Sequence, residues 1–172
     1  MASQSLADRV NSNWKRLSGV PGGKWLFSKS IGLTAPYSGT IDARVEELEP
    51  GYAKVTLRDR KAVRNHLNSI HAIALMNLGE ISTGLATISG MPSECRSILS
   101  GLSMDYLKKG RGTLTATCRI PVIESSARKE YEIIGEIHDE SGDLVARATA
   151  RWLIGPRKEA GAPATESAEA AA

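Results

Sequence analysis

Apolar and polar residues alternate along this chain with two different periods. Between residues 4 and 17 the apolar positions recur at steps of three and four, which predicts an amphipathic helix. Gly and Pro residues at 19–23 end this helix and predict an irregular stretch to about residue 39. From residue 40 the period changes to two, as expected for strands with one buried face.

Six runs of this kind predict six strands, two before residue 60 and four after residue 100. They cover residues 40–46, 53–58, 102–106, 114–120, 131–137 and 144–152. Short connections between successive runs favour antiparallel pairing.

The segment between the second and third runs is apolar on nearly every side of a helix. Residues 70–88 therefore predict a helix that is buried all round. One strongly curved antiparallel sheet wrapped around a single central helix satisfies this pattern. Gly79 and Gly84 each reduce helix propensity by roughly 1 kcal/mol relative to Ala, so we expect another backbone to approach them closely.

Composition narrows the class of protein without identifying it. A chain of 172 residues fits one domain, and we assign it to residues 1–155, with residues 156–172 as a disordered tail. The net charge of +3 is too small to indicate nucleic-acid binding. Two cysteines without metal-ligand spacing exclude a disulfide framework and a zinc site. No apolar run is long enough for a membrane span or a signal peptide, which predicts a cytoplasmic protein.

A polar cluster precedes the central helix, and one carboxylate, Glu80, lies inside it. Glu80 either lies on a narrow solvent-facing strip beside Asn77, or is paired with an Arg or Thr, or is kept ready to accept a proton. Burial raises the pKa of a carboxyl group, which favours the last role near neutral pH. At the helix start, Asn68 or Ser69 is expected as the N-cap, while unpaired first-turn amides offer a site for an oxyanion.

The joint spacing of these residues resembles a known family. Asn65, His71, Ala72 and Glu80 follow the pattern Asn-x5-His-[small]-x7-acid. This pattern, with two strands before the helix and four after it, is similar to the hotdog-fold acyl-CoA thioesterases, in particular the phenylacetyl-CoA thioesterase-like group. The resemblance covers about residues 38–155 and implies an α+β hotdog fold with an extra N-terminal helix at 4–17.

The resemblance also implies a role for each residue of the pattern. The backbone N–H of Ala72 would bind the thioester carbonyl oxygen, and His71 would orient the loop that precedes it. Asn65 would hold the substrate or the attacking water, and Glu80 would activate that water or attack directly. The family usually has Gly at position 72 and Asp at position 80. Ala72 keeps the backbone amide, but its methyl group narrows the approach of the substrate to that amide. The side chain of Glu80 is one methylene longer than that of Asp.

Helix geometry argues against a site built within one chain. Ala72 and Glu80 are separated by about 12 Å along a helix axis, so one thioester carbon cannot touch both. Two copies with antiparallel helices would bring Glu80 of one copy to Ala72 of the other. We therefore expect a homodimer or a dimer of dimers, with no nucleic-acid or membrane partner.

The expected substrate is an acyl-CoA, and no cofactor or metal is expected. Lys108, Lys109 and Arg111, in a turn between two strands, are candidates for the phosphates of coenzyme A, or else form a solvated turn. The acyl pocket is expected between the helix and the sheet of the neighbouring subunit, near Leu75 and Met76.

Two alternatives remain open at the level of sequence. A β-hydroxyacyl dehydratase of the same fold would use His66 with Glu80, although the loop after His66 lacks the Pro and Gly residues of those enzymes. A non-catalytic acyl-CoA-binding protein would have the same fold without turnover.

Overall fold

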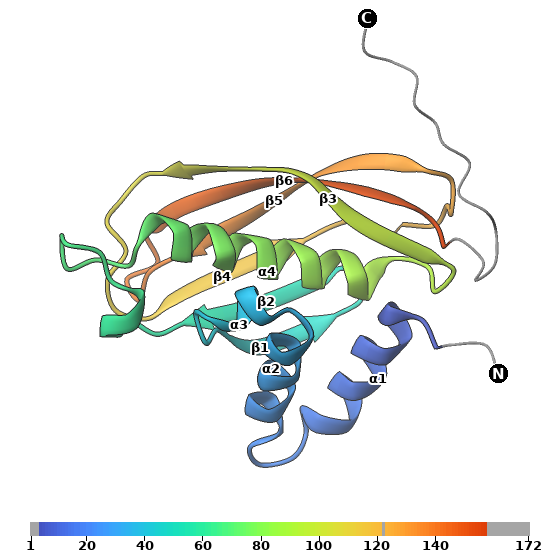
Figure 1. Cartoon of the computed structure of the whole chain (residues 1–172), viewed down its shortest axis with the longest axis horizontal. Coiled ribbons are helices and arrows are strands. Elements are labelled where there is room, and N and C mark those ends of the chain that lie inside the picture. Colours follow the sequence, from blue (N-terminus) through green and yellow to red (C-terminus); the bar gives the residue numbers. More distant parts are fainter. Residues whose placement is uncertain (1–3, 122, 158–172) are drawn as a thin grey trace, which may run out of the picture.

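Six strands form one antiparallel sheet, and the central helix α4 lies against its concave face (Figure 1). This computed structural model describes residues 4–121 and 123–157. The strands are β1 Arg44–Glu49, β2 Tyr52–Leu57, β3 Cys95–Tyr106, β4 Leu114–Arg119, β5 Lys129–His138 and β6 Leu144–Pro156. Their order in the sheet is β1-β2-β4-β5-β6-β3, with α4 between β2 and β3 in the chain. The predicted hotdog architecture, α+β with a long helix and an N-terminal helix, is confirmed.

Two strands begin at least four residues from the predicted start, and β6 ends at Pro156 instead of residue 152. Strand β1 begins at Arg44 instead of residue 40, and β3 begins at Cys95 instead of residue 102. The pairing of β3 with β6 shifts register between Leu99 and Gly101. Such a bulge adds one residue to the strand and interrupts its alternation, so the period of two detects only the second half of β3.

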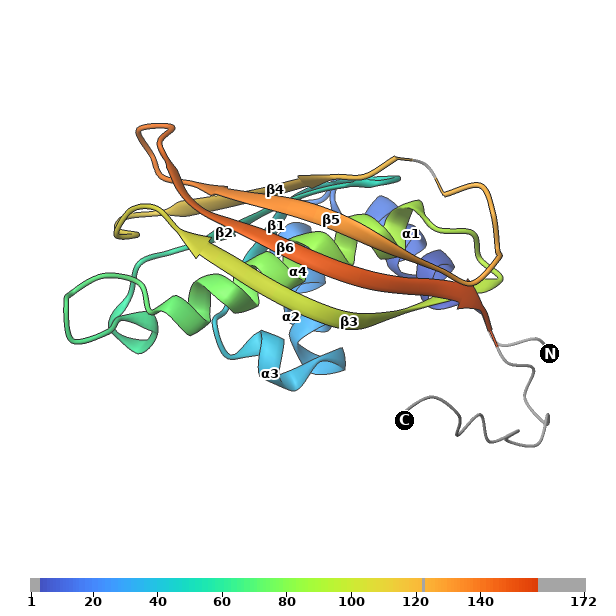
Figure 2. The same ribbon diagram turned by 90° about the horizontal axis from the view of Figure 1, so that it is seen from above.

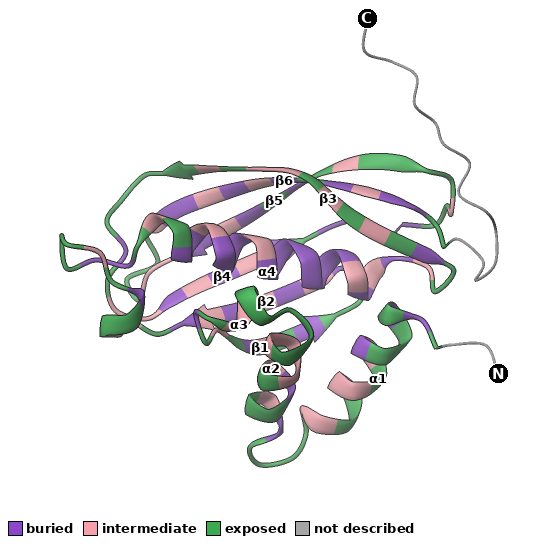
Figure 3. Ribbon diagram, viewed as in Figure 1, coloured by how far each residue is buried: buried purple, intermediate pink, exposed green. Residues whose placement is uncertain are grey.

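Helix α4, Ala72–Gly90, is buried on nearly every side, as predicted (Figure 3). Its buried hydroxyl groups donate hydrogen bonds to helix carbonyl groups one turn back, as Thr83 does to Gly79 O at 2.9 Å and Thr87 to Thr83 O at 2.7 Å. Among the described residues, no buried side-chain nitrogen or oxygen lacks a hydrogen-bond partner.

The two helix glycines allow close packing against side chains of the sheet. A Cβ atom at position 79 would lie 2.7 Å from Ala148 Cβ, and one at position 84 would lie 3.2 Å from the Trp152 ring. The expectation that another backbone approaches these positions is therefore wrong, because strand side chains occupy the space.

The N-terminal region contains three helices. Helix α1, Leu6–Leu17, matches the predicted helix, with Ser5 as its N-cap. Helices α2, Gly23–Thr34, and α3, Pro36–Gly39, occupy a stretch that we expected to be irregular. Helix α2 was not predicted because Phe27 is its only large buried residue, while Trp25, Leu26 and Leu33 are exposed. The ring centroids of Phe27 and Trp14 lie 5.0 Å apart.

The two edges of the sheet are covered differently. At the β1 edge, Ser28 Oγ of α2 accepts a hydrogen bond from Val45 N at 2.9 Å. The other edge is the outer side of β3, which pairs only with β6 within residues 4–121 and 123–157. Seen from above, α3 projects beyond this edge (Figure 2). The long β3 edge is therefore open to a further strand.

Two sequence predictions concern regions beyond these elements. None of the helices in the described residues combines the length and apolar character needed to cross a membrane. The predicted tail, residues 156–172, lies outside the described residues from position 158 onward.

Candidate active site

Asn65 organises the loop that leads into α4. Its side-chain oxygen accepts hydrogen bonds from Leu67 N at 2.9 Å and from Ser69 Oγ at 3.2 Å. Asn68 has φ of 52°, a left-handed conformation that Asn adopts more readily than most residues. The loop is joined to the connection between β3 and β4 by a bond from Ile70 N to Gly110 O at 2.8 Å. The oxygen of Asn65 is thus used within the loop, while its NH2 group makes no hydrogen bond to the described residues.

The first turn of α4 leaves one amide free. His71, rather than Asn68 or Ser69, is the N-cap, and its Nδ1 accepts a hydrogen bond from Ile73 N at 3.1 Å. His71 O accepts the N–H groups of Ala74 and Leu75, at 2.9 and 3.1 Å. Among the residues that the structure describes, the N–H of Ala72 has no acceptor. It is therefore available to an oxyanion at the positive end of the helix dipole.

A groove of about 340 Å³ opens beside this amide. Its lining includes Asn65, Ala72, Leu75, Tyr106, Lys108 and Lys109. Tyr106, at the end of β3, was not singled out from the sequence, yet its hydroxyl donates a hydrogen bond to Ala72 O at 3.1 Å. Burial raises the pKa of Tyr106, which keeps this hydroxyl protonated and able to donate.

The three predicted phosphate-binding residues differ in their contacts. Lys108 forms ion pairs with Asp139, at 2.6 Å, and with Asp143. The Nε of Arg111 donates to Asn68 O at 3.3 Å. Lys109 is exposed, lines the groove and makes no ion pair with any described residue. Lys109 is thus the cation most available to an anion in the groove.

Glu80 faces a second pocket, of about 160 Å³, two turns further along α4. The hydroxyl of Ser38, from α3, donates to its Oε2 at 3.3 Å. Burial raises the pKa of the Glu80 carboxyl, and this hydrogen bond partly offsets the increase by stabilising the anion. Neither an Arg nor a Thr is the partner, and neighbouring Asn77 is buried with its amide donating to Tyr37 O at 3.3 Å. The expectation of an Arg or Thr partner is therefore wrong, and Glu80 is only partly exposed, with buried Asn77 beside it.

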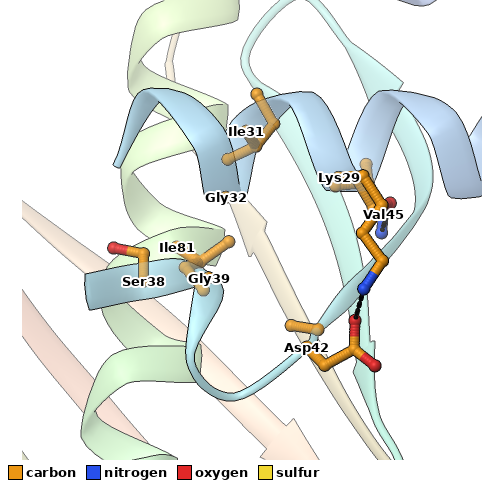
Figure 4. A pocket seen from close by; sticks show the side chains of 10 residues that line it. Lys29, Ile31, Gly32, Ser38, Gly39, Asp42, Val45 and Ile81 are labelled. Carbon is orange, nitrogen blue, oxygen red and sulfur yellow. Dashed lines mark hydrogen bonds and ion pairs between the residues drawn. The ribbon is translucent and has the colours of Figure 1, made fainter. Parts of the chain in front are cut away.

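A smaller cavity of about 30 Å³ adjoins this pocket and shares Ile31, Ser38 and Ile81 with it (Figure 4). At its outer side, Lys29 Nζ lies 2.7 Å from Asp42 Oδ1. This cavity has room for about one or two water molecules, so it is too small for a substrate.

Within one chain, the structure brings Asn65 and Ala72 together in the groove and places Glu80 in the separate pocket. His71 lines neither of these cavities. The wall of the Glu80 pocket includes Ser38 and Trp152, which are distant in sequence and which no local pattern indicated. No group of three metal-ligating side chains occurs in the described part of the chain.

Comparisons with known proteins place this arrangement in a family. The chain matches DUF4442, a domain of unknown function, over residues 23–154. A crystal structure from a genomics effort is 30% identical, with a TM-score of 0.76, covering 87% of this chain and 99% of that one. A protein of unknown function from Pseudomonas aeruginosa, named a probable thioesterase, is 21% identical, with a TM-score of 0.68, covering 80% and 97% of the two chains.

A thioesterase family protein from Silicibacter pomeroyi is 16% identical, with a TM-score of 0.63, covering 76% of this chain and 96% of that one. No curated protein matches the chain. The structural matches confirm the predicted resemblance to the hotdog-fold thioesterases at the level of the fold.

Proposed function

The chain belongs to the DUF4442 family, and we propose that it is a dimeric acyl-thioester hydrolase acting on coenzyme A esters. The observation that carries this proposal is the pair of complementary half-sites on α4. One half-site has an unpaired backbone N–H at Ala72, and the other has a half-buried carboxylate at Glu80. The names of the Pseudomonas and Silicibacter proteins support the same reaction class.

A two-fold dimer is the arrangement that joins these half-sites. The eight residues between Ala72 and Glu80 correspond to about 12 Å along the helix axis. In a symmetric dimer, each contact between the Ala72 groove and the partner's Glu80 is formed twice. The open edge of β3 supports this assembly, because pairing two such edges continues the sheet and brings the helices beneath it together.

The proposed reaction is hydrolysis by an activated water. The Glu80 carboxylate accepts a proton from water as the water oxygen bonds to the thioester carbon, while the Ala72 N–H stabilises the oxygen that becomes negative. The tetrahedral intermediate then releases the coenzyme A thiolate, which takes up the proton held by Glu80, so that the free acid and the thiol leave and the carboxylate is regenerated. Asn65 lines the groove and its NH2 group makes no hydrogen bond to the described residues, so we expect this group to hold the substrate or this water.

Phosphate groups of coenzyme A are proposed to lie along the same groove. Lys109 makes no ion pair with any described residue and is available to meet them, and Arg111 adds positive charge nearby. Lys108 already pairs with two carboxylates, so we expect Lys109 to contribute most to coenzyme A affinity.

The dehydratase alternative receives less support. His66 is exposed in the loop and lines neither the groove nor the Glu80 pocket. A direct His66–Glu80 pair within one chain is therefore not formed.

Mixing two inactive variants tests the shared site. Glu80→Gln removes the proton acceptor, and Asn65→Ala removes the polar group of the other half-site, so each pure dimer should lose about 10²–10⁴-fold in rate. After the two are unfolded and refolded together, half of the dimers are mixed and each mixed dimer has one intact site. We expect recovery of about a quarter of the wild-type rate of thiol release.

Two outcomes would contradict this proposal. If mixing restores nothing although mixed dimers form, the site lies within one chain. If wild-type protein binds acyl-CoA but releases no thiol from any ester tested, the protein is a binder and not a hydrolase. Glu94→Gln, which changes an exposed carboxylate next to β3, provides the matched control and should leave the rate unchanged.

A further inference from the structure

The pocket beside Glu80 is formed jointly by the central helix and the N-terminal helices. Val10, Leu85 and Trp152 are buried and form its floor, while Leu6, Thr34 and Ala35 are exposed and form its rim. The floor comes from α1, α4 and β6, and the rim comes from the start of α1 and the end of α2. Segments outside the sheet and α4 therefore determine the width of this pocket.

The pocket is apolar except at one side. Glu80, Ser38 and Thr34 supply its polar atoms, and its other lining residues are aliphatic or aromatic, apart from Gly84. Gly84 matters for this shape, because a Cβ there would lie 3.2 Å from the Trp152 ring and 3.8 Å from Glu80 Oε1. The glycine thus keeps open the space between the carboxylate and the indole ring.

The volume sets the size of a group that fits. The pocket measures about 160 Å³, and an apolar protein cavity of about 150 Å³ holds a benzene molecule. An apolar group of about six carbons, aromatic or aliphatic, is therefore matched to this space. An acyl chain whose carbonyl carbon lies at Glu80 has its tail directed along these walls.

We propose that this pocket, and not the region near Leu75 and Met76 that we expected from the sequence, binds the acyl group of the substrate, and that α1 and the end of α2 limit that group to about six carbons. This inference rests on the proposed hydrolase function and deepens it by naming the substrate class. Short aliphatic and small aromatic acyl thioesters are the preferred substrates, and long-chain fatty acyl thioesters are excluded.

A series of acyl-CoA esters tests the size limit. From acetyl to hexanoyl, kcat/KM should rise by about fourfold per methylene, the factor that corresponds to the ~0.8 kcal/mol of each buried CH2. Phenylacetyl-CoA should match hexanoyl-CoA, and decanoyl-CoA should fall at least about tenfold below it. A profile that rises steadily to palmitoyl-CoA would contradict the proposal.

Variants at the rim test the role of the N-terminal helices. Leu6→Ala enlarges the pocket and should shift the preferred chain to longer acids, whereas Leu26→Ala, at a leucine of similar exposure (50% against 44%) that does not line the pocket, should not. Ala35→Leu fills the rim and should lower kcat/KM for hexanoyl-CoA about tenfold while sparing acetyl-CoA. Ala62→Leu, at an exposed alanine outside the pocket, is its control.

A binding measurement separates this proposal from the proposed catalysis. S-alkyl coenzyme A thioethers cannot be hydrolysed, and calorimetric titration with the ethyl, hexyl and decyl compounds reports acyl-group affinity without turnover. If the hexyl compound binds most tightly, and Ala35→Leu lowers the affinity for the hexyl compound but not for the ethyl compound, the pocket assignment stands even in a protein without hydrolase activity. If the three compounds bind equally, the pocket does not hold the acyl group, whatever the activity.

Discussion

At position 72 a backbone group rather than a side chain carries the proposed chemistry. The neighbouring first-turn amides of α4 have acceptors on His71, whereas the Ala72 N–H has none among the described residues. The resemblance to the hotdog-fold thioesterases predicted glycine here, but the proposed role needs only an amide, which Ala also supplies. The methyl group of Ala72 lines the groove without closing it.

Ala72→Pro removes this N–H and should leave the helix intact. Proline is well tolerated at the first helical position, and His71 already has the extended backbone (φ −65°, ψ 141°) that a residue before proline adopts. We expect thermal unfolding close to that of wild type and a loss of about 10²–10³-fold in thioester hydrolysis. Ala72→Gly keeps the N–H and should retain the rate. A proline variant as active as wild type would show that this amide is not the oxyanion site.

At the scale of elements, the position of α4 depends on its close approach to the sheet. Gly79 faces Ala148 of β6 and Met104 of β3, and a Cβ at Gly79 would lie 2.7 and 2.9 Å from their terminal carbons. The methyl of Ala148 is fixed on a central strand and cannot move aside. This contact sets the depth of α4, and therefore the position of both half-sites relative to the open β3 edge.

Gly79→Ala should destabilise the protein by up to about 2 kcal/mol in unfolding free energy. Overpacking costs about 1–3 kcal/mol, and the gain in helix propensity offsets about 1 kcal/mol of it. Urea unfolding monitored by circular dichroism measures the difference. Adding Ala148→Gly removes the clash and should recover part of the loss. Equal stability of the single variant and wild type would mean that α4 can shift away from the sheet at little cost.

At the scale of the whole molecule, the two half-sites and the open β3 edge are consistent with an assembly of two chains. The β1 edge is tied to α2, whereas β3 presents twelve residues whose outer side is unpaired among the described elements. A charged side chain on an edge strand opposes edge-to-edge pairing. The edge is thus the place to test the proposed dimer without disturbing the core.

If the proposed dimer forms through β3, Ile98→Lys should yield a folded monomer without the proposed hydrolase activity. Ile98 is 51% exposed, so the substitution removes little core packing from a single chain. Ile134→Lys, at a residue of β5 with 49% exposure and strands on both sides, is the matched control and should remain dimeric and active. Sedimentation velocity and thiol release measure both properties. A dimeric Ile98→Lys variant would place the interface elsewhere.

Several elements were predictable because their burial is one-sided and regular. The runs around Tyr52–Leu57 and Leu114–Arg119 alternate without interruption and were predicted closely. Helix α2 was missed because it buries Phe27 and leaves Trp25, Leu26 and Leu33 exposed, which produces no apolar stripe. The first half of β3 was missed because a bulge interrupts its alternation.

The residues of the candidate site were likewise predictable from the sequence only in part. The sequence by itself determined the order of strands and the central helix, because hydrophobic period is a local property of the chain, and its resemblance to a known family proposed Asn65, Ala72 and Glu80 as site residues. Only the tertiary structure decided which side chains surround them: Ser38 at 3.3 Å from Glu80, Tyr106 at 3.1 Å from Ala72 O, and Trp152 against Gly84. These contacts join segments more than thirty residues apart, and such pairings arise from how the sheet and the N-terminal helices pack around α4, which no local pattern records.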